Sequence, residues 1–128
     1  EAKLTRTIRA DSDAFTFRGE WEKNMDADEG VAMTSESRDA SVEGKFGGST
    51  VALLHDAAPG ARLLGVWIDG IEYPPVDMSA TEQRSSRTLL AEGLDPGEHT
   101  LRLRPLLRWR AGAAMTIRGL AVGQQAGP

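Results

Sequence analysis

The feature that most constrains the fold of this chain is a hydrophobic pattern with a period of two residues. Asp39–Phe46 places Ala40, Val42, Gly44 and Phe46 on one side and polar residues on the other, and Glu98–Pro105 alternates in the same way. Successive side chains of a β-strand point to opposite faces, so this alternation predicts half-buried strands. Turn-forming residues interrupt the pattern about every 8–12 residues, which is typical of an all-β sandwich or barrel.

Roughly eight or nine strands are expected on this pattern. They are Lys3–Ile8, Ala14–Trp21, Val31–Glu36, Asp39–Phe46, Ser49–His55, Arg62–Asp69, Thr88–Leu94, Glu98–Pro105 and Ala114–Val122. Ser49–His55 is the most continuously apolar, as a central strand covered on both faces would be. The acidic segment Glu22–Gly30 is expected to be a loop, and the polar segment Met78–Arg87 a surface loop or at most one turn of helix. We expect two packed antiparallel sheets, most economically a jelly roll.

Length and composition limit the domain count and the partners. The 128 residues fit one domain, with a core at about residues 3–122 and a flexible tail at residues 123–128. A net charge of −4 gives no general attraction to phosphate, so nucleic acid is not expected as a partner. No apolar run approaches the roughly 20 residues of a membrane span, so direct membrane insertion is not expected. Cysteine is absent, which removes disulfides, thiolate catalysis and cysteine zinc sites.

Four motifs in succession resemble a known family. They are "FGGSTVALLHD", "GVWIDG", "LLAEGLDPGEHTLRLRP" and "MTIRGLAV". Their order is similar to that in the galactose-binding-like jelly rolls of carbohydrate-active proteins. The similarity is greatest to the accessory sandwich that precedes the hydrolase domain in the second family of carbohydrate esterases and in related SGNH-type esterases. It covers about Phe46–Val122, together with the strand around Phe15–Trp21.

This resemblance implies a non-catalytic accessory module that acts in a secreted, periplasmic or cell-surface protein. Most of the basic residues are arginine, and alanine and glycine are frequent; this composition indicates a GC-rich bacterial source. The chain has no Gly-Asp-Ser nucleophile motif and no Gly-x-Ser-x-Gly elbow, so we do not expect it to be an enzyme. Its two histidines are His55 and His99. His99 shares parity with the core residues of its strand, so it is expected to be buried with a hydrogen-bond partner, the alternative being a ligand contact.

The acidic segment offers a candidate metal site. Asn24, Asp26 and Asp28 place oxygen ligands at alternate positions, as at the start of a calcium loop. Glu29 and Ser35 stand where the EF-hand pattern needs glycine and glutamate, so that motif fails. A structural calcium in an irregular loop remains an alternative to a solvated acidic turn, and no other cofactor is expected.

Aromatic residues indicate the candidate ligand site. Val66 and Ile68 take the core face of their strand, so Trp67 is expected on the outer face. Tyr73 lies in a stiff extended segment, and Trp109 stands between two arginines. Sugar rings stack on aromatic faces while polar groups bind the hydroxyls. The candidate ligand-binding residues are Trp67, Tyr73, Trp109, Arg102 and Arg104.

Two functions fit these residues. The first is a carbohydrate-binding or accessory sandwich. The second is a structural module that docks onto another subunit or a catalytic domain through the same surface. In the turn after Trp67, Asp69 is expected to hydrogen-bond the turn's own backbone and Gly70 to adopt a positive φ. A concave polar pocket around the tryptophans would favour carbohydrate, and a flat apolar patch would favour a protein partner.

Overall fold

A computed structural model describes residues 2–26, 30–35, 39–57, 63–78, 80–82, 84–95, 97–106 and 115–125. In these ranges the chain forms strands and no helix, and so contains no helix able to cross a membrane. The strands are β1 (Ala2–Arg9), β2 (Phe15–Arg18), β3 (Glu22–Asp26), β4 (Gly30–Ser35), β5 (Ser41–Gly47), β6 (Thr50–Ala57), β7 (Leu63–Ile68), β8 (Ile71–Asp77), β9 (Arg84–Ala91), β10 (Glu98–Pro105) and β11 (Met115–Gln125).

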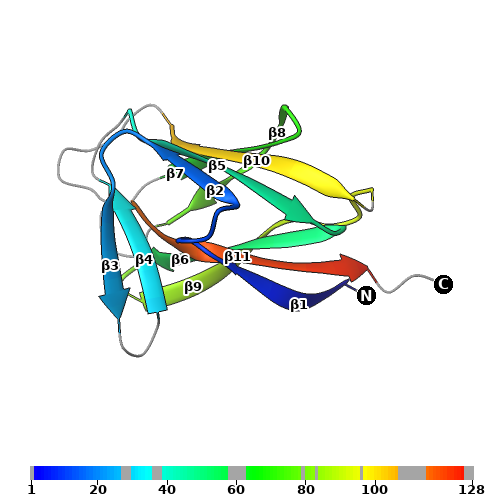
Figure 1. Cartoon of the computed structure of the whole chain (residues 1–128), viewed down its shortest axis with the longest axis horizontal. Helices are drawn as coiled ribbons and strands as arrows, with labels where there is room; N and C mark the ends of the chain where they lie inside the picture. Colours follow the sequence, from blue (N-terminus) through cyan, green and yellow to red (C-terminus); the bar gives the residue numbers. More distant parts are fainter. Residues whose placement is uncertain are drawn as a thin grey trace.

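The strands form two sheets that lie face to face (Figure 1). One sheet has the order β3-β4-β11-β6-β9, with β1 also paired to β11, and the other has the order β2-β5-β10-β7-β8. Every pairing is antiparallel. The predicted two-sheet antiparallel β-sandwich is therefore confirmed.

The core lies between the sheets and follows the alternation seen in the sequence. On β5 and β10 every second residue is buried, including Val42, Phe46, Leu101 and Leu103. The facing sheet contributes its own alternate residues, and the largest apolar side chains that are fully buried are Leu53, Leu64, Ile68, Met78, Leu101, Leu103, Met115, Ile117 and Leu120. Removing such chains from water is the main force that holds the two sheets together.

Two segments expected to be loops contain strands. Within the acidic segment, β3 pairs with β4 along Glu22–Asp26, and in the polar segment β9 begins at Arg84 and pairs with β6. Both strands lie at the edges of the six-stranded sheet. Met25 on β3 is 65% exposed and the first half of β9 is mostly exposed, so neither stretch has the buried face that makes alternation visible in a sequence.

The C-terminal strand is longer than expected. The predicted tail began at residue 123, but β11 continues to Gln125 because Gly123–Gln125 pair with Ala2–Leu4 of β1. Backbone pairing does not require apolar side chains, so this polar end gave no strand signal. Residues 126–128 lie outside the described residues.

Strands β7 and β8 are joined by a two-residue turn at Asp69 and Gly70. Ile68 pairs directly with Ile71, and both turn residues have positive φ, 54° at Asp69 and 82° at Gly70. This is the backbone expected of an Asp-Gly turn in a tight hairpin, in which two positive φ angles match the twist of the strands. The segment "IEYPP" that follows is thus strand β8, which pairs back onto the Trp67 strand.

Candidate functional site

A row of side chains crosses the outer face of the five-stranded sheet. Cross-strand pairing places Thr16 of β2 opposite Glu43 of β5, Glu43 opposite Arg102 of β10, Arg102 opposite Trp67 of β7, and Trp67 opposite Glu72 of β8. Directly opposed residues on one face have neighbouring side chains. The row therefore puts a tryptophan between an arginine and a glutamate.

Trp67 is half-buried on this outer face, as the parity of its strand predicts, since Val66 and Ile68 are buried on the other face. Its ring extends back over Gly65, where an added Cβ would lie 2.7 Å from two ring carbons and 2.8 Å from Leu106. The absence of a side chain at Gly65 thus gives the indole room beside the sheet. The Arg104 guanidinium carbon lies 4.8 Å from the centroid of the ring, at cation–π distance.

A hollow of about 260 Å³ lies beside Trp67. It is lined by Glu43, Trp67, Gly70, Thr100, Arg102 and Arg104. The lining combines one apolar ring with two guanidinium donors, a carboxylate acceptor and a hydroxyl that both donates and accepts. These are the groups that a sugar ring needs, with a flat surface for its C–H face and polar partners for its hydroxyls.

At the end of this hollow, hydrogen bonds of Asp69 and His99, together called the polar clip, link three segments of the chain. The carboxylate of Asp69 accepts from Nδ1 of His99 at 2.6 Å and from the backbone N–H of Thr100 at 2.9 Å. Nε2 of His99 lies 2.6 Å from the carbonyl of Asp95. Both imidazole nitrogens thus face acceptors, which favours the doubly protonated ring. The hydrogen bond to Asp69 raises the pKa of His99, and the same bond lowers the pKa of Asp69.

The clip corrects one expectation and confirms another. Asp69 does not bond the backbone of its own turn with its carboxylate, because that group crosses to β10. The bond to Thr100 joins the turn to another strand, so it cannot be predicted from the residues of the turn alone. His99 is buried with hydrogen-bond partners, and the Phe46 ring packs against it at 5.4 Å between centroids.

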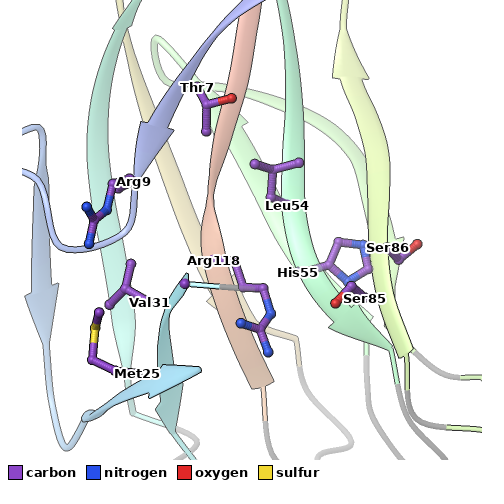
Figure 2. A pocket seen from close by; sticks show the side chains of 10 residues that line it. Thr7, Arg9, Met25, Val31, Leu54, His55, Ser85, Ser86 and Arg118 are labelled. Atoms are coloured by element: carbon purple, nitrogen blue, oxygen red, sulfur yellow. The ribbon is translucent and has the colours of Figure 1, made fainter. Parts of the chain in front are cut away.

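The six-stranded sheet carries a second hollow of about 700 Å³. Its lining consists of Thr7, Arg9, Met25, Gly30, Val31, Leu54, His55, Ser85, Ser86 and Arg118. Figure 2 shows Arg118 in the middle, with Met25 and Val31 on one side and His55, Ser85 and Ser86 on the other. Among the described residues, no tryptophan, tyrosine or phenylalanine lines this hollow, so it lacks the stacking surface found beside Trp67.

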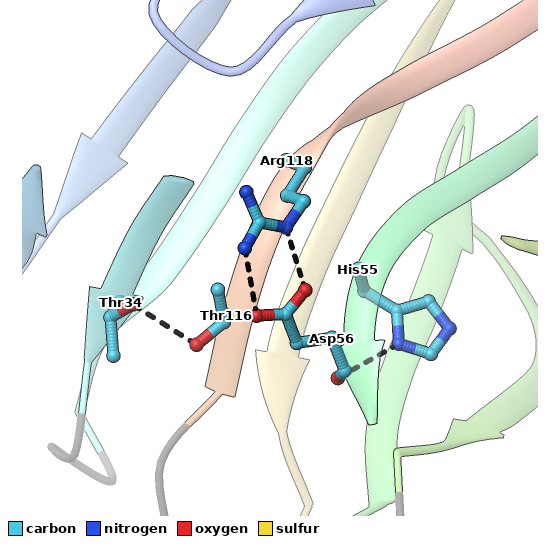
Figure 3. Close-up of polar contacts among 5 residues, drawn as sticks. All are labelled: Thr34, His55, Asp56, Thr116 and Arg118. Carbon is cyan, nitrogen blue, oxygen red and sulfur yellow. Dashed lines mark hydrogen bonds and ion pairs between the residues drawn. The ribbon is translucent and has the colours of Figure 1, made fainter. Parts of the chain in front are cut away.

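The polar contacts beside the second hollow are structural. Arg118 donates from Nε to Asp56 at 2.6 Å and from Nη2 at 3.0 Å, while Thr34 and Thr116 share a hydrogen bond of 3.0 Å (Figure 3). His55 donates from Nδ1 to the carbonyl of Asp56 and accepts at Nε2 from the Thr88 hydroxyl at 2.8 Å. Burial lowers the pKa of His55, which fits its neutral form in this arrangement.

The structure brings together three of the five predicted ligand-binding residues, namely Trp67, Arg102 and Arg104. Tyr73 does not join them. It pairs with Val66 and packs against the core cluster, so it lies on the opposite face of the sheet from Trp67. Trp109 lies outside the described residues.

The predicted metal-ligating residues lie on a strand edge. Asn24 is exposed on β3 opposite Ala32, and Asp26 is the last residue of that strand, opposite Gly30. Asp28 lies outside the described residues. Among the residues that are described, no three histidine, aspartate or glutamate side chains gather closely enough to hold a metal ion.

The sequence analysis did not place four residues beside Trp67, and two of them, Glu43 and Thr100, line the hollow. Gly65 had a readable signal, since a glycine two residues before an outward tryptophan shares its face and leaves space for the ring. Glu43, Glu72 and Thr100 had none. Their positions beside Trp67 follow from the register of four strands, which no local pattern encodes.

No protein-family model matches the chain, and neither does any curated protein sequence. Several solved structures share the fold. A family two carbohydrate esterase from Cellvibrio japonicus is 18% identical with a TM-score of 0.69, and the match covers 98% of this chain and 35% of the esterase. A two-domain esterase active on acetylated mannans is 12% identical with a TM-score of 0.73, and the match covers 93% of this chain and 36% of that one.

A smaller protein matches over nearly its whole length. A family 35 carbohydrate binding module from Clostridium thermocellum is 15% identical with a TM-score of 0.62, and the match covers 92% of this chain and 98% of the module. The chain thus spans about a third of each esterase but nearly all of the binding module. The resemblance to the sandwiches of carbohydrate-active proteins, first drawn from four motifs, is confirmed for the fold.

Proposed function

We propose that this chain is a non-catalytic carbohydrate-binding module, with its binding site on the outer face of the five-stranded sheet. The observation that carries the proposal is the half-buried Trp67 in a hollow lined by Arg102, Arg104, Glu43 and Thr100. The indole supplies a stacking surface, and the polar side chains supply donors and acceptors for hydroxyls at its edge. The cation–π contact with Arg104 holds both partners in place before a ligand arrives.

The fold neighbours support the same class of function. The family 35 carbohydrate binding module is matched over nearly its whole length, whereas the esterases are matched over about a third of theirs. A chain of this kind fits the accessory part of a larger carbohydrate-active protein. We propose that it works outside the cell in such a protein, next to a catalytic domain.

The absence of catalysis is part of the proposal. An esterase would need a serine bonded to a histidine that is in turn bonded to an acid. All four imidazole nitrogens bond to partners other than serine, namely Asp56 and Thr88 for His55, and Asp69 and Asp95 for His99. In these contacts neither histidine is bonded to a serine, and the one hydroxyl that contacts an imidazole is that of Thr88.

The alternative function is docking onto a neighbouring domain, for which we expected a flat apolar patch around the tryptophans. The exposed large hydrophobic residues described are Met25, Leu63, Ile71 and Leu89, which belong to four different strands in two sheets. The hollow beside Trp67 is lined mainly by charged and polar residues. These features favour carbohydrate over a protein partner at this surface.

A glycan-array screen of the isolated chain tests the proposal. Wild type is compared with Trp67→Ala, which removes the stacking surface, and with Tyr73→Phe, which alters an aromatic residue on the opposite face. We expect glycan binding that is lost in Trp67→Ala and kept in Tyr73→Phe. Circular dichroism confirms that each variant folds. Binding that survives Trp67→Ala, or a folded wild type that binds no glycan, would refute the proposed site.

A further inference from the structure

The two arginines beside Trp67, Arg102 and Arg104, bring two positive charges to one side of the hollow. In the described part of the chain, the ion pairs involve other side chains, and neither Arg102 nor Arg104 has a carboxylate within ion-pair distance. They stand two positions apart on one face of β10, so their like charges repel. Two guanidiniums beside an aromatic ring can bind an anion where the nearest carboxylates do not cancel their charge.

Two carboxylates flank this arrangement, Glu43 of β5, which also lines the hollow, and Glu72 of β8. Glu43 stands on the far side of Arg102 from Trp67, so it is two strands, or about 10 Å, from the indole strand. Opposite Arg104 stands Gly65, which has no side chain. Glu72 faces Trp67 from the other flank, on β8. The site is therefore cationic along β10 and has one carboxylate on its β5 side and one on its β8 side, while Arg104 itself faces no acidic side chain.

This polarity orients a ligand. A guanidinium presents paired N–H donors that match a carboxylate, whereas a single carboxylate such as Glu72 accepts hydrogen bonds from hydroxyls. A sugar lying on Trp67 would meet both if it carried an acid group at one end and hydroxyls at the other. A neutral sugar would leave Arg104, which faces no acidic side chain, without an anionic partner.

We propose that this site selects acidic sugars, specifically hexuronic acid units whose carboxylate binds Arg102 and Arg104 while the pyranose ring lies against Trp67. The inference rests on the proposed function, since it names the ligand class of the same site. Arg104 has the larger share of the selectivity, because it contacts the ring and faces no acidic side chain. Arg102 adds to it but also faces Glu43.

The test compares ligands that differ only in charge. Trisaccharides of galacturonate, glucuronate and mannuronate are measured by calorimetry beside their methyl esters, which keep the ring shape and lose the negative charge. We expect at least one acid to bind about tenfold more tightly than its ester at low salt, the strength of a charge-assisted pair. The advantage should shrink as salt rises, because exposed charges are screened.

Variants separate this inference from the proposed function. Arg104→Gln should remove most of the preference for acid while binding of the ester persists, and Trp67→Ala should weaken both. Arg87→Gln, on β9 of the other sheet, removes the same charge elsewhere and should change nothing. Equal binding of acids and esters, lost in Trp67→Ala, would overturn the acidic selectivity and leave the carbohydrate module standing. Absence of binding to acids, esters and all glycans of the array would overturn both.

Discussion

The His99–Asp69 clip predicts how the stability of the domain depends on pH. The pKa of His99 is raised by its hydrogen bond to Asp69, so protonated His99 stabilises the folded state. This contribution is complete below the unfolded-state value of 6.5 and is lost as pH rises through the higher pKa of the folded state. The pKa of Asp69 is lowered, so its contribution is complete above 3.8 and is lost as pH falls below that value.

The geometry sets the size of the effect. When His99 loses a proton, one of two nitrogens that lie 2.6 Å from acceptors no longer donates. A hydrogen bond to a charged group contributes about 1.5–3 kcal/mol, but the Asp69 side chain is 45% exposed, so solvent screening reduces the expected loss to about 1 kcal/mol. For a domain of this size, that is a fall in Tm of about 3–5 °C between pH 6 and pH 9.

The Asp69→Asn variant isolates this contribution. Asparagine tolerates positive φ and keeps an oxygen for the Thr100 N–H, but it has no negative charge. We expect the variant to be less stable than wild type at pH 6 and to show a flatter dependence of Tm on pH up to pH 9, measured by differential scanning calorimetry. Glu22→Gln, an exposed change on β3, should leave the wild-type slope intact. An unchanged slope in Asp69→Asn would show that His99 does not depend on this carboxylate.

Two substitutions and the addition of calcium provide three further tests. Gly65→Ala would place a Cβ 2.7 Å from the Trp67 ring, so we expect shifted indole fluorescence, about tenfold weaker glycan binding and a Tm lowered by a few degrees. Asp56→Ala would leave the Arg118 guanidinium without its main anion at a site where the two side chains are 14% and 10% exposed, and should cost about 3 kcal/mol in urea unfolding; a loss below 1 kcal/mol would contradict this. Calcium should leave Tm unchanged, because Asn24 lies in β3, paired with β4, rather than in a loop that wraps an ion; a rise that chelator reverses would show a calcium site.

The sequence predicted those strands that have one buried face and one exposed face. Alternation revealed β5 and β10, because their inward residues are apolar and their outward residues are charged. The edge strand β3 and the first half of β9, before Thr88, were missed, because these stretches are held by backbone pairing on one side and expose much of their surface. Hydrophobic periodicity reports burial, so a strand without a buried face leaves no such trace.

The candidate site, like the fold, was predictable only in part. The face of Trp67 was predictable, because its two apolar neighbours fix the parity of β7. Tyr73 was predicted to belong to the same site as Trp67, but it follows the turn that reverses the chain and precedes two prolines. Its register opposite Val66 puts it on the inner face. Parity within one strand is local information, whereas the face of a residue on the next strand depends on the turn between them.

Asp69 connects the stability of the domain to the composition of its site. Its positive φ closes the turn to β8, its backbone N–H bonds the Thr100 carbonyl at 2.8 Å, and its carboxylate bonds the Thr100 N–H. These contacts fix how β7 lies against β10. A slip of one residue in that register would turn Arg102 away from Trp67 and bring a core leucine opposite the indole. The aspartate that reads as a turn residue in the sequence therefore also places the arginines beside the tryptophan, and weakening it should lower glycan affinity as well as stability.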